Sequence, residues 1–357
     1  MSKIIIALLL FQAIILAPFA QENKQDSLLR ILDTISSIED QMSFCVQTGE
    51  SYSLDDWSQF EYWLNKGIDI ATKNEHPKII DMYSRLCNEA ISQGKMEDAA
   101  EFILLGKTAI NSETPVKYKY AILRSEVDYY LRVEQYEISK QKGYELINLS
   151  EINNDTIQYT AALHNLGINF YKESDIETAD SLISRAYEMN KLINHEPYIK
   201  INLSMLANIA SAQKNYTKAI EYNLIVKTIF DSIKELSGMA MIRINISNDY
   251  YELGQKELAY KYVNEGIELA KTYEFKRWEW VGYQNLSDFY SKDGNHEVAL
   301  ENYILYINLK ETVINEQSAL KLNSLTEELN QKQLEILENR DALQAEKINV
   351  QDEKIKL

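Results

Sequence analysis

The feature that most constrains the fold of this chain is a small residue that recurs every 40 positions. The positions are occupied by Ala99, Ser139, Ala179, Ala219, Ala259 and Ala299. Self-similarity with a fixed period of about 20 to 50 residues is typical of solenoids, in which each unit packs only on its neighbours. The repeat therefore predicts a stacked array of similar units.

Each of these small residues follows a short polar stretch. The stretches are Gly94-Lys95, Glu134-Gln135, Ser174-Asp175, Lys214-Asn215, Gly254-Gln255 and Gly294-Asn295. Gly and Asn tolerate the left-handed backbone that ends a helix, and the chain holds only 4 Pro and 11 Gly. Each unit is therefore predicted to be a helix, a short turn and a second helix, which makes the fold all-α.

The unit that begins near Thr160 shows the residue pattern most clearly. Before its turn it carries Leu163, Leu166, Gly167 and Phe170, and after the turn Ala179, Ile183 and Ala186. This pattern resembles the tetratricopeptide repeat (TPR), and the resemblance implies an α-solenoid of antiparallel helix pairs. The period of 40 exceeds the usual length of about 34, so the helices or their connections must be longer. The predicted array covers residues 80–316 as six units.

The regions on either side of the array differ from it. Residues 21–79 are predicted to be an N-terminal helical capping region, in which 27–72 read as one more helical pair. Residues 317–357 contain neither Pro nor Gly, and apolar residues recur every seven positions at Leu322, Leu329, Ile336, Leu343, Val350 and Leu357. This stripe predicts a long helix. Because the companion seam is polar after Leu325, both a coiled coil and a lone solvated helix remain open.

The N-terminus has the layout of a secretory signal peptide. Lys3 precedes an almost wholly apolar run from Ile4 to Ala17, and a polar segment follows Ala20. We therefore expect residues 1–20 to be a signal peptide and the protein to be exported, periplasmic or extracellular, with an uncleaved N-terminal anchor as the alternative. In such a compartment Cys45 and Cys87 could form a disulfide, or both could be buried free thiols.

The charge balance and the absence of motifs exclude several classes of function. The net charge is −17, which argues against nucleic acid because phosphate binding needs clustered Lys and Arg. No nucleophile, metal-protease or phosphate-loop motif is present, and the four His residues lie far apart. The sequence predicts that the protein is not an enzyme and requires no cofactor or metal.

The resemblance to TPR proteins also implies a binding groove, since the first helix of each pair lines a concave surface there. One column of equivalent positions holds Asn88, Asp128, Ile168, Asn208, Asn248 and Asp288. A second column, four residues earlier, holds Ser84, Arg124, His164, Ser204, Ile244 and Gln284. We expect a peptide-binding groove at Asn88, Arg124, Asp128, His164, Asn208, Asn248, Gln284 and Asp288. The alternative is that Asn is merely tolerated on a solvated face.

These features predict an exported scaffold that binds a protein or peptide partner in its groove. A second interpretation is the extracytoplasmic sensor portion of a signal-transduction regulator, because the chain resembles the TPR and coiled-coil part of bacterial membrane-bound regulators, whose output domain is absent from it. A third is a structural oligomer, a homodimer joined through residues 317–357.

Overall fold

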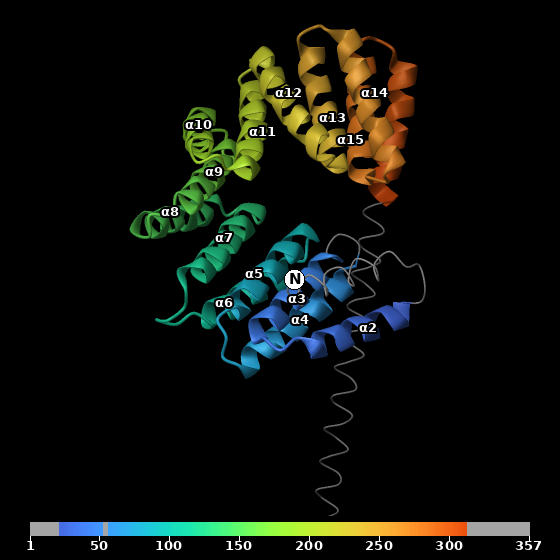
Figure 1. Cartoon of the computed structure of the whole chain (residues 1–357). Helices are drawn as coiled ribbons and strands as arrows, with labels where there is room; N and C mark the ends of the chain where they lie inside the picture. Colours follow the sequence, from blue (N-terminus) through green and yellow to red (C-terminus); the bar gives the residue numbers. More distant parts are fainter. Residues whose placement is uncertain (1–20, 53–55, 313–357) are drawn as a thin grey trace, which may run out of the picture. The chain divides into compact units, whose positions relative to one another are not determined.

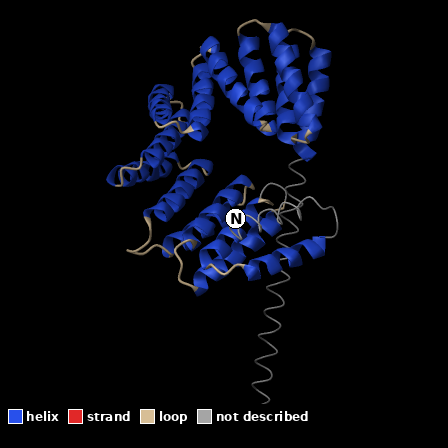
Figure 2. Cartoon of the chain, viewed as in Figure 1, coloured by secondary structure: helices blue, strands red, loops and turns tan. Residues whose placement is uncertain are grey.

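The computed structural model describes residues 21–52 and 56–312, and these residues form helices joined by short turns, with no strand among them (Figure 2). The predicted all-α class is therefore confirmed. The predicted signal peptide at 1–20 and the predicted long helix at 317–357 lie outside the described residues.

Within each unit, helices that follow one another along the chain pack as antiparallel neighbours, for example α9 with α10 and α13 with α14 (Figure 1). Their bounds are α2 Gln21–Thr34, α3 Ile38–Glu50, α4 Trp57–Lys73, α5 Ile79–Ser92, α6 Met96–Thr108, α7 Val116–Arg132, α8 Tyr136–Ile152, α9 Thr156–Lys172, α10 Ile176–Leu192, α11 Glu196–Ala212, α12 Tyr216–Ile233, α13 Leu236–Glu252, α14 Lys256–Thr272 and α15 Lys276–Lys292. Residues 296–312 are also helical. From α7 to α15 each helix begins 20 residues after the previous one, so a pair repeats every 40 residues.

The turns between these helices share one backbone feature. A residue with positive φ occurs every 20 positions from 134 to 294, for example Glu134 at 60° and Gly254 at 76°. After α7 the N–H of Glu134 donates to the carbonyl of Leu131, and that of Gln135 donates to the carbonyl of Tyr130. This arrangement satisfies the last carbonyl groups of the helix and reverses the chain within three residues.

Small residues allow the two helices of a pair to approach closely, as the sequence predicted. Ala99, Ala179 and Ala259 are fully buried. At Gly167 on α9 an added Cβ would lie 2.5 Å from Ile183 Cδ1 on α10. Since atoms cannot approach so closely, a larger side chain at position 167 would require Ile183 to move, and the small residue permits the close spacing of this pair.

The N-terminal region corrects one prediction. Residues 27–72 were expected to form one helical pair, whereas the structure has the three helices α2, α3 and α4 there. The extra break lies at Ser37, whose hydroxyl accepts a hydrogen bond from the Asp40 N–H and so caps the start of α3. Leu28 on α2 then packs in the same cluster as Cys45 and Trp63.

The chain divides into two compact units, residues 1–205 and 206–357. In the first unit Cys45 and Cys87 are free and buried, and they belong to different apolar clusters. Burial raises the pKa of each thiol to about 12. The structure thus has two buried thiols, the second of the alternatives that the sequence left open.

Candidate groove of the first unit

The first column of predicted groove residues lies along three neighbouring first helices in the first unit. Asn88 is on α5, Asp128 on α7 and Ile168 on α9, and α7 packs against both α5 and α9. Asn88 is exposed, while Asp128 and Ile168 are partly exposed. A 40-residue step along the sequence therefore corresponds to a step from one first helix to the next.

These three residues line one cavity of about 540 Å³. The other lining residues come from the same helices, from the turn after α7 and from the start of α8, and they are Ile91, Ser92, Leu131, Arg132, Glu134, Tyr136 and Lys172. The volume falls within the range of about 300–1,000 Å³ that is usual for ligand pockets. We call this cavity the α5–α7–α9 groove.

Among the ionisable residues that line this groove, Asp128 has the pKa that departs most from its usual value. Burial raises its pKa from 3.8 to about 6, although the nearby guanidinium groups of Arg124 and Arg132 act to lower it. No hydrogen bond contributes to this shift. Because a carboxylate that lacks hydrogen-bond donors is costly to bury, a ligand group that donates to Asp128 or brings a positive charge would be stabilised there.

Asn88 is held in place from the core side of the groove. Its Oδ1 accepts a hydrogen bond of 2.9 Å from the hydroxyl of Ser125, which is fully buried on α7. Ser125 in turn shares a 2.8 Å hydrogen bond with Ser84 on α5. These contacts link α5 to α7 and fix the Asn88 amide at the edge of the cavity.

The second predicted column lies deeper than expected. His164 is only 6% exposed, and its Nδ1 lies 2.7 Å from Asn202 Oδ1. Burial lowers its pKa below the usual value of 6.5. Ser84 and Ile244 are also buried, while Arg124 is partly buried. His164 therefore packs between helices in the core and is not brought to the groove surface.

The remaining predicted residues belong to the second unit. Asn208 lies on α11, Asn248 on α13, and Gln284 and Asp288 on α15, and all four are exposed. Their exposure agrees with the solvated-face alternative as well as with a binding surface.

The structure also adds groove residues that the sequence reasoning missed. Arg132 and Lys172 lie one helical turn beyond Asp128 and Ile168 and line the same cavity. Both residues lie four positions after members of the first column, and residues four apart share one face of a helix. The sequence could therefore have predicted them as a third column. In the second unit the equivalent residues are Glu252 and Lys292, which form a 2.6 Å ion pair with each other.

Comparison with known proteins identifies the fold. The apo form of RapI matches with a TM-score of 0.59 at 11% identity, over 77% of this chain and 99% of its own. A signal transduction ATPase with a tetratricopeptide repeat sensor from Pyrococcus horikoshii matches with a TM-score of 0.58 at 17% identity, over 89% of this chain and 50% of its own. The chain has a TPR-like fold. It spans half the length of that ATPase.

A third TPR-like match was solved with a ligand. A plasmid's Rap conjugation gene regulator, in complex with a peptide, matches with a TM-score of 0.50 at 14% identity, over 83% of this chain and 95% of its own. No protein-family model matches the sequence, and no curated protein matches it. At such identities these structures establish the fold alone.

Within 21–52 and 56–312, no helix combines the length and apolar character needed to cross a membrane. Over the same ranges, no group of three or more His, Cys, Asp or Glu side chains could hold a metal ion.

Proposed function

We propose that this TPR-like protein is an interaction scaffold that binds a peptide, or an extended segment of a partner protein, in the α5–α7–α9 groove. The observation that carries the proposal is that three equivalent positions on successive helices converge on one cavity of about 540 Å³. An extended chain that crosses the helices would meet Asn88, Asp128 and Ile168 in turn, because each position comes from the next repeat.

The chemistry of the cavity suits a peptide. Ile91, Leu131 and Ile168 offer apolar contact, while Asn88 and Tyr136 offer hydrogen bonds. Backbone amides need such polar partners when they leave water.

The charges in the groove favour a ligand that carries both positively and negatively charged groups. Asp128 is partly exposed in the cavity and has a pKa raised by burial, whereas Arg132 and Lys172, which line the same cavity, are exposed. We therefore expect a cationic ligand group at Asp128 and acidic groups beside Arg132 and Lys172. The proposal of a peptide ligand is supported by the Rap conjugation gene regulator, a protein of similar fold whose structure was solved in complex with a peptide.

The test uses peptides selected from a random displayed library against the full chain. The double variant Asn88→Ala plus Asp128→Ala should weaken binding of the selected peptides by about tenfold or more, which corresponds to roughly 1.4 kcal/mol. The control is Asn148→Ala plus Glu151→Ala, which removes an exposed amide and an exposed carboxylate from the second helix α8.

Isothermal titration calorimetry on all three proteins gives the affinities, and circular dichroism checks that each is folded. Equal affinity for the wild type and the groove variant would contradict the proposal. Loss of binding in the control alone would place the site on the second helices instead.

A further inference from the structure

Two turns of the first unit line a second cavity, which is separate from the α5–α7–α9 groove. It has a volume of about 420 Å³ and lies between the turn after α8 and the turn after α10. Its lining residues are Asn153, Asn154, Asp155, Thr156, Ile157, Ile193 and His195. Ile157 is at the start of α9, whereas Lys172, which lines the groove, ends the same helix. The two cavities therefore lie toward opposite ends of α9.

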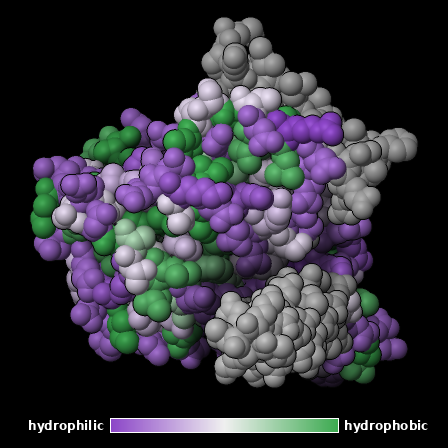
Figure 3. Space-filling model, turned by 90° about the horizontal axis from the view of Figure 1, so that it is seen from below, coloured by the Kyte–Doolittle hydropathy of each residue, from purple (hydrophilic) through white to green (hydrophobic). Residues whose placement is uncertain are grey.

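Large apolar side chains face water around this second cavity. Ile157 is 39% exposed and Ile193 is 40% exposed, while Ile152 and Leu192, the last residues of α8 and α10, are 70% and 84% exposed. Scattered apolar residues are ordinary on a protein surface, and the face drawn in Figure 3 has such a mixture. These four residues instead belong to two turns that share one cavity, and we call them the turn surface.

The fold does not require large apolar residues at these positions. The equivalents of Leu192 in the next two repeats are Ser232 and Thr272, and both are exposed. The equivalent of Ile157 two repeats later is Ser237. Because polar residues stand at the same positions of the same chain, the turns form without apolar side chains there. Contact with a partner therefore explains the exposed apolar group better than the needs of the turn do.

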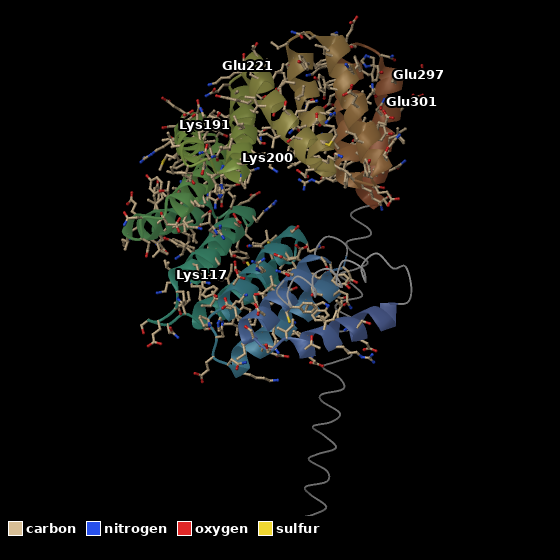
Figure 4. The ribbon with its side chains drawn as sticks, viewed as in Figure 1. Lys117, Lys191, Lys200, Glu221, Glu297 and Glu301 are labelled. Carbon is tan, nitrogen blue, oxygen red and sulfur yellow. The ribbon has the colours of Figure 1, made fainter. Side chains whose placement is uncertain are left out.

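Carboxylates outnumber cationic groups in the two segments that carry the turn surface. In residues 151–157 and 188–200 the carboxylates are those of Glu151, Asp155, Glu188 and Glu196. The cationic side chains of these segments are Lys191 and Lys200 (Figure 4), and Lys191 Nζ lies 3.5 Å from a Glu188 carboxylate oxygen. Asp155 itself lines the cavity. The apolar group therefore has an acidic border.

The acidic border distinguishes among the possible occupants of the turn surface. A second copy of this chain, docked through the same surface, would bring the same carboxylates, and like charges repel. An anionic lipid surface would be repelled as well. A segment whose apolar side chains are flanked by Lys or Arg matches both the apolar centre and the border. An amphipathic helix with a basic polar face presents that pattern.

We propose that the turn surface docks a basic amphipathic helix of a partner protein. An apolar side chain of this helix enters the cavity between the two turns and contacts Ile157 and Ile193, while its Lys or Arg side chains face Asp155 and Glu196. An apolar anchor within a polar border is the usual anatomy of a protein interface. Because the cavity and the groove are separate, the helix and the groove ligand bind independently.

The probe is a fluorescein-labelled model helix of about 18 residues, or five helical turns, with Leu on one side and Lys on the other. A second probe has Glu in place of every Lys. Fluorescence anisotropy with the full chain should show that the Leu/Lys helix binds more tightly than the Leu/Glu helix by about tenfold or more, since only the first complements the acidic border.

The main variant is Ile157→Ser plus Ile193→Asn, which removes the apolar side chains that line the cavity and introduces the residues found at the equivalent positions 237 and 153. It should weaken binding of the Leu/Lys helix by about tenfold. The matched control is Leu104→Ser plus Ile138→Thr, which changes two exposed apolar residues of α6 and α8 to those at the equivalent positions 184 and 178. The control should leave the affinity unchanged, and circular dichroism checks that both proteins are folded.

A third variant tests the border alone. Glu151→Gln plus Glu196→Gln keeps the apolar residues and should weaken binding of the Leu/Lys helix by about threefold, because it removes only exposed charges.

Equal affinity of the wild type and the main variant for the Leu/Lys helix would overturn the proposal, and so would an equal loss in the control. A Leu/Glu helix that binds as tightly as the Leu/Lys helix would also overturn it. Displacement of the Leu/Lys helix by a saturating concentration of a groove peptide would place the probe in the α5–α7–α9 groove and contradict a separate surface.

Discussion

Each unit of the molecule holds an aspartate whose pKa burial raises to about 6, and the two differ in what surrounds them. Asp128 on α7 and Asp249 on α13 both have a pKa of about 6, and burial is the main cause in each case. Asp249 is 4% exposed. It accepts a hydrogen bond from the Ser211 hydroxyl and another, 3.1 Å long, from Asn223 Nδ2. No hydrogen bond contributes at Asp128.

The difference follows from a shift of one position in the repeat. The equivalent of Asp128 in the second unit is Asn248, which is exposed, and Asp249 is the next residue. One residue turns the side chain by roughly 100° around the helix axis, which moves it from the groove column into the contact between helices. A raised pKa therefore marks burial in both units, and the hydrogen-bond partners separate a structural carboxylate from one that is available to a ligand.

The largest effect should come from comparing Asn and Ala at position 249. Asn keeps an acceptor for Asn223 and can donate to the Ser211 hydroxyl, whereas Ala leaves both partners without their hydrogen bond. Asp249→Asn should therefore be more stable than Asp249→Ala by about 2 kcal/mol, at roughly 1 kcal/mol for each hydrogen bond. Urea denaturation at neutral pH gives both free energies of unfolding.

The same pair of substitutions at position 128 serves as the control. Asp128→Asn and Asp128→Ala should differ by less than about 0.5 kcal/mol, because no hydrogen bond is lost at this site. A gap at 128 as large as the gap at 249 would show that the two carboxylates are held alike, and the comparison would fail.

A smaller effect is expected from the pH dependence of stability. The folded pKa of Asp128, about 6, lies above its ordinary value of 3.8. Its contribution to stability is therefore fully present below pH 3.8 and is lost as the pH rises through about 6. Because the side chain is partly exposed, we expect a loss of about 1 kcal/mol. The lowered pKa of His164 acts in the opposite direction, since its contribution is lost as the pH falls below 6.5.

Asp128→Asn isolates the carboxylate from the histidine, since both proteins retain His164. Between pH 4 and pH 7 the variant should gain stability relative to the wild type by the same amount, about 1 kcal/mol, as measured by urea denaturation at each pH. If the difference in free energy of unfolding between the two proteins stays the same from pH 4 to pH 7, ionisation of Asp128 does not destabilise the folded protein.

The helix pairs and their turns could be predicted from the sequence because they depend on local signals. Ala179 and Gly167 mark the close approach of two helices, and the polar stretches mark the reversals. The left-handed residue itself was harder to place, since Glu134 and Lys214 occupy it as well as Gly254. At such positions the packing of the flanking helices imposes a conformation that the residue alone does not favour.

The groove could be predicted only in part. Asp128 and Asn88 follow from a column of equivalent positions, but the burial of His164 depends on Asn202, which lies one first helix further along. A side chain on a first helix can face the groove or pack against an adjacent helix. The packing angles of three helices determine which of the two it does. The third helix at the N-terminus was missed for a related reason, because Ser37 caps α3 within a stretch that reads as one helix.

The central claim is that the α5–α7–α9 groove receives the partner. Hydrogen–deuterium exchange on the full chain, with and without a peptide selected from the library, tests it most directly. The account predicts slower exchange in the segments that line the cavity, on α5, α7 and α9, and unchanged exchange on α13 and α15. Protection confined to α13 and α15, or spread along the second helices α8 and α10, would contradict it.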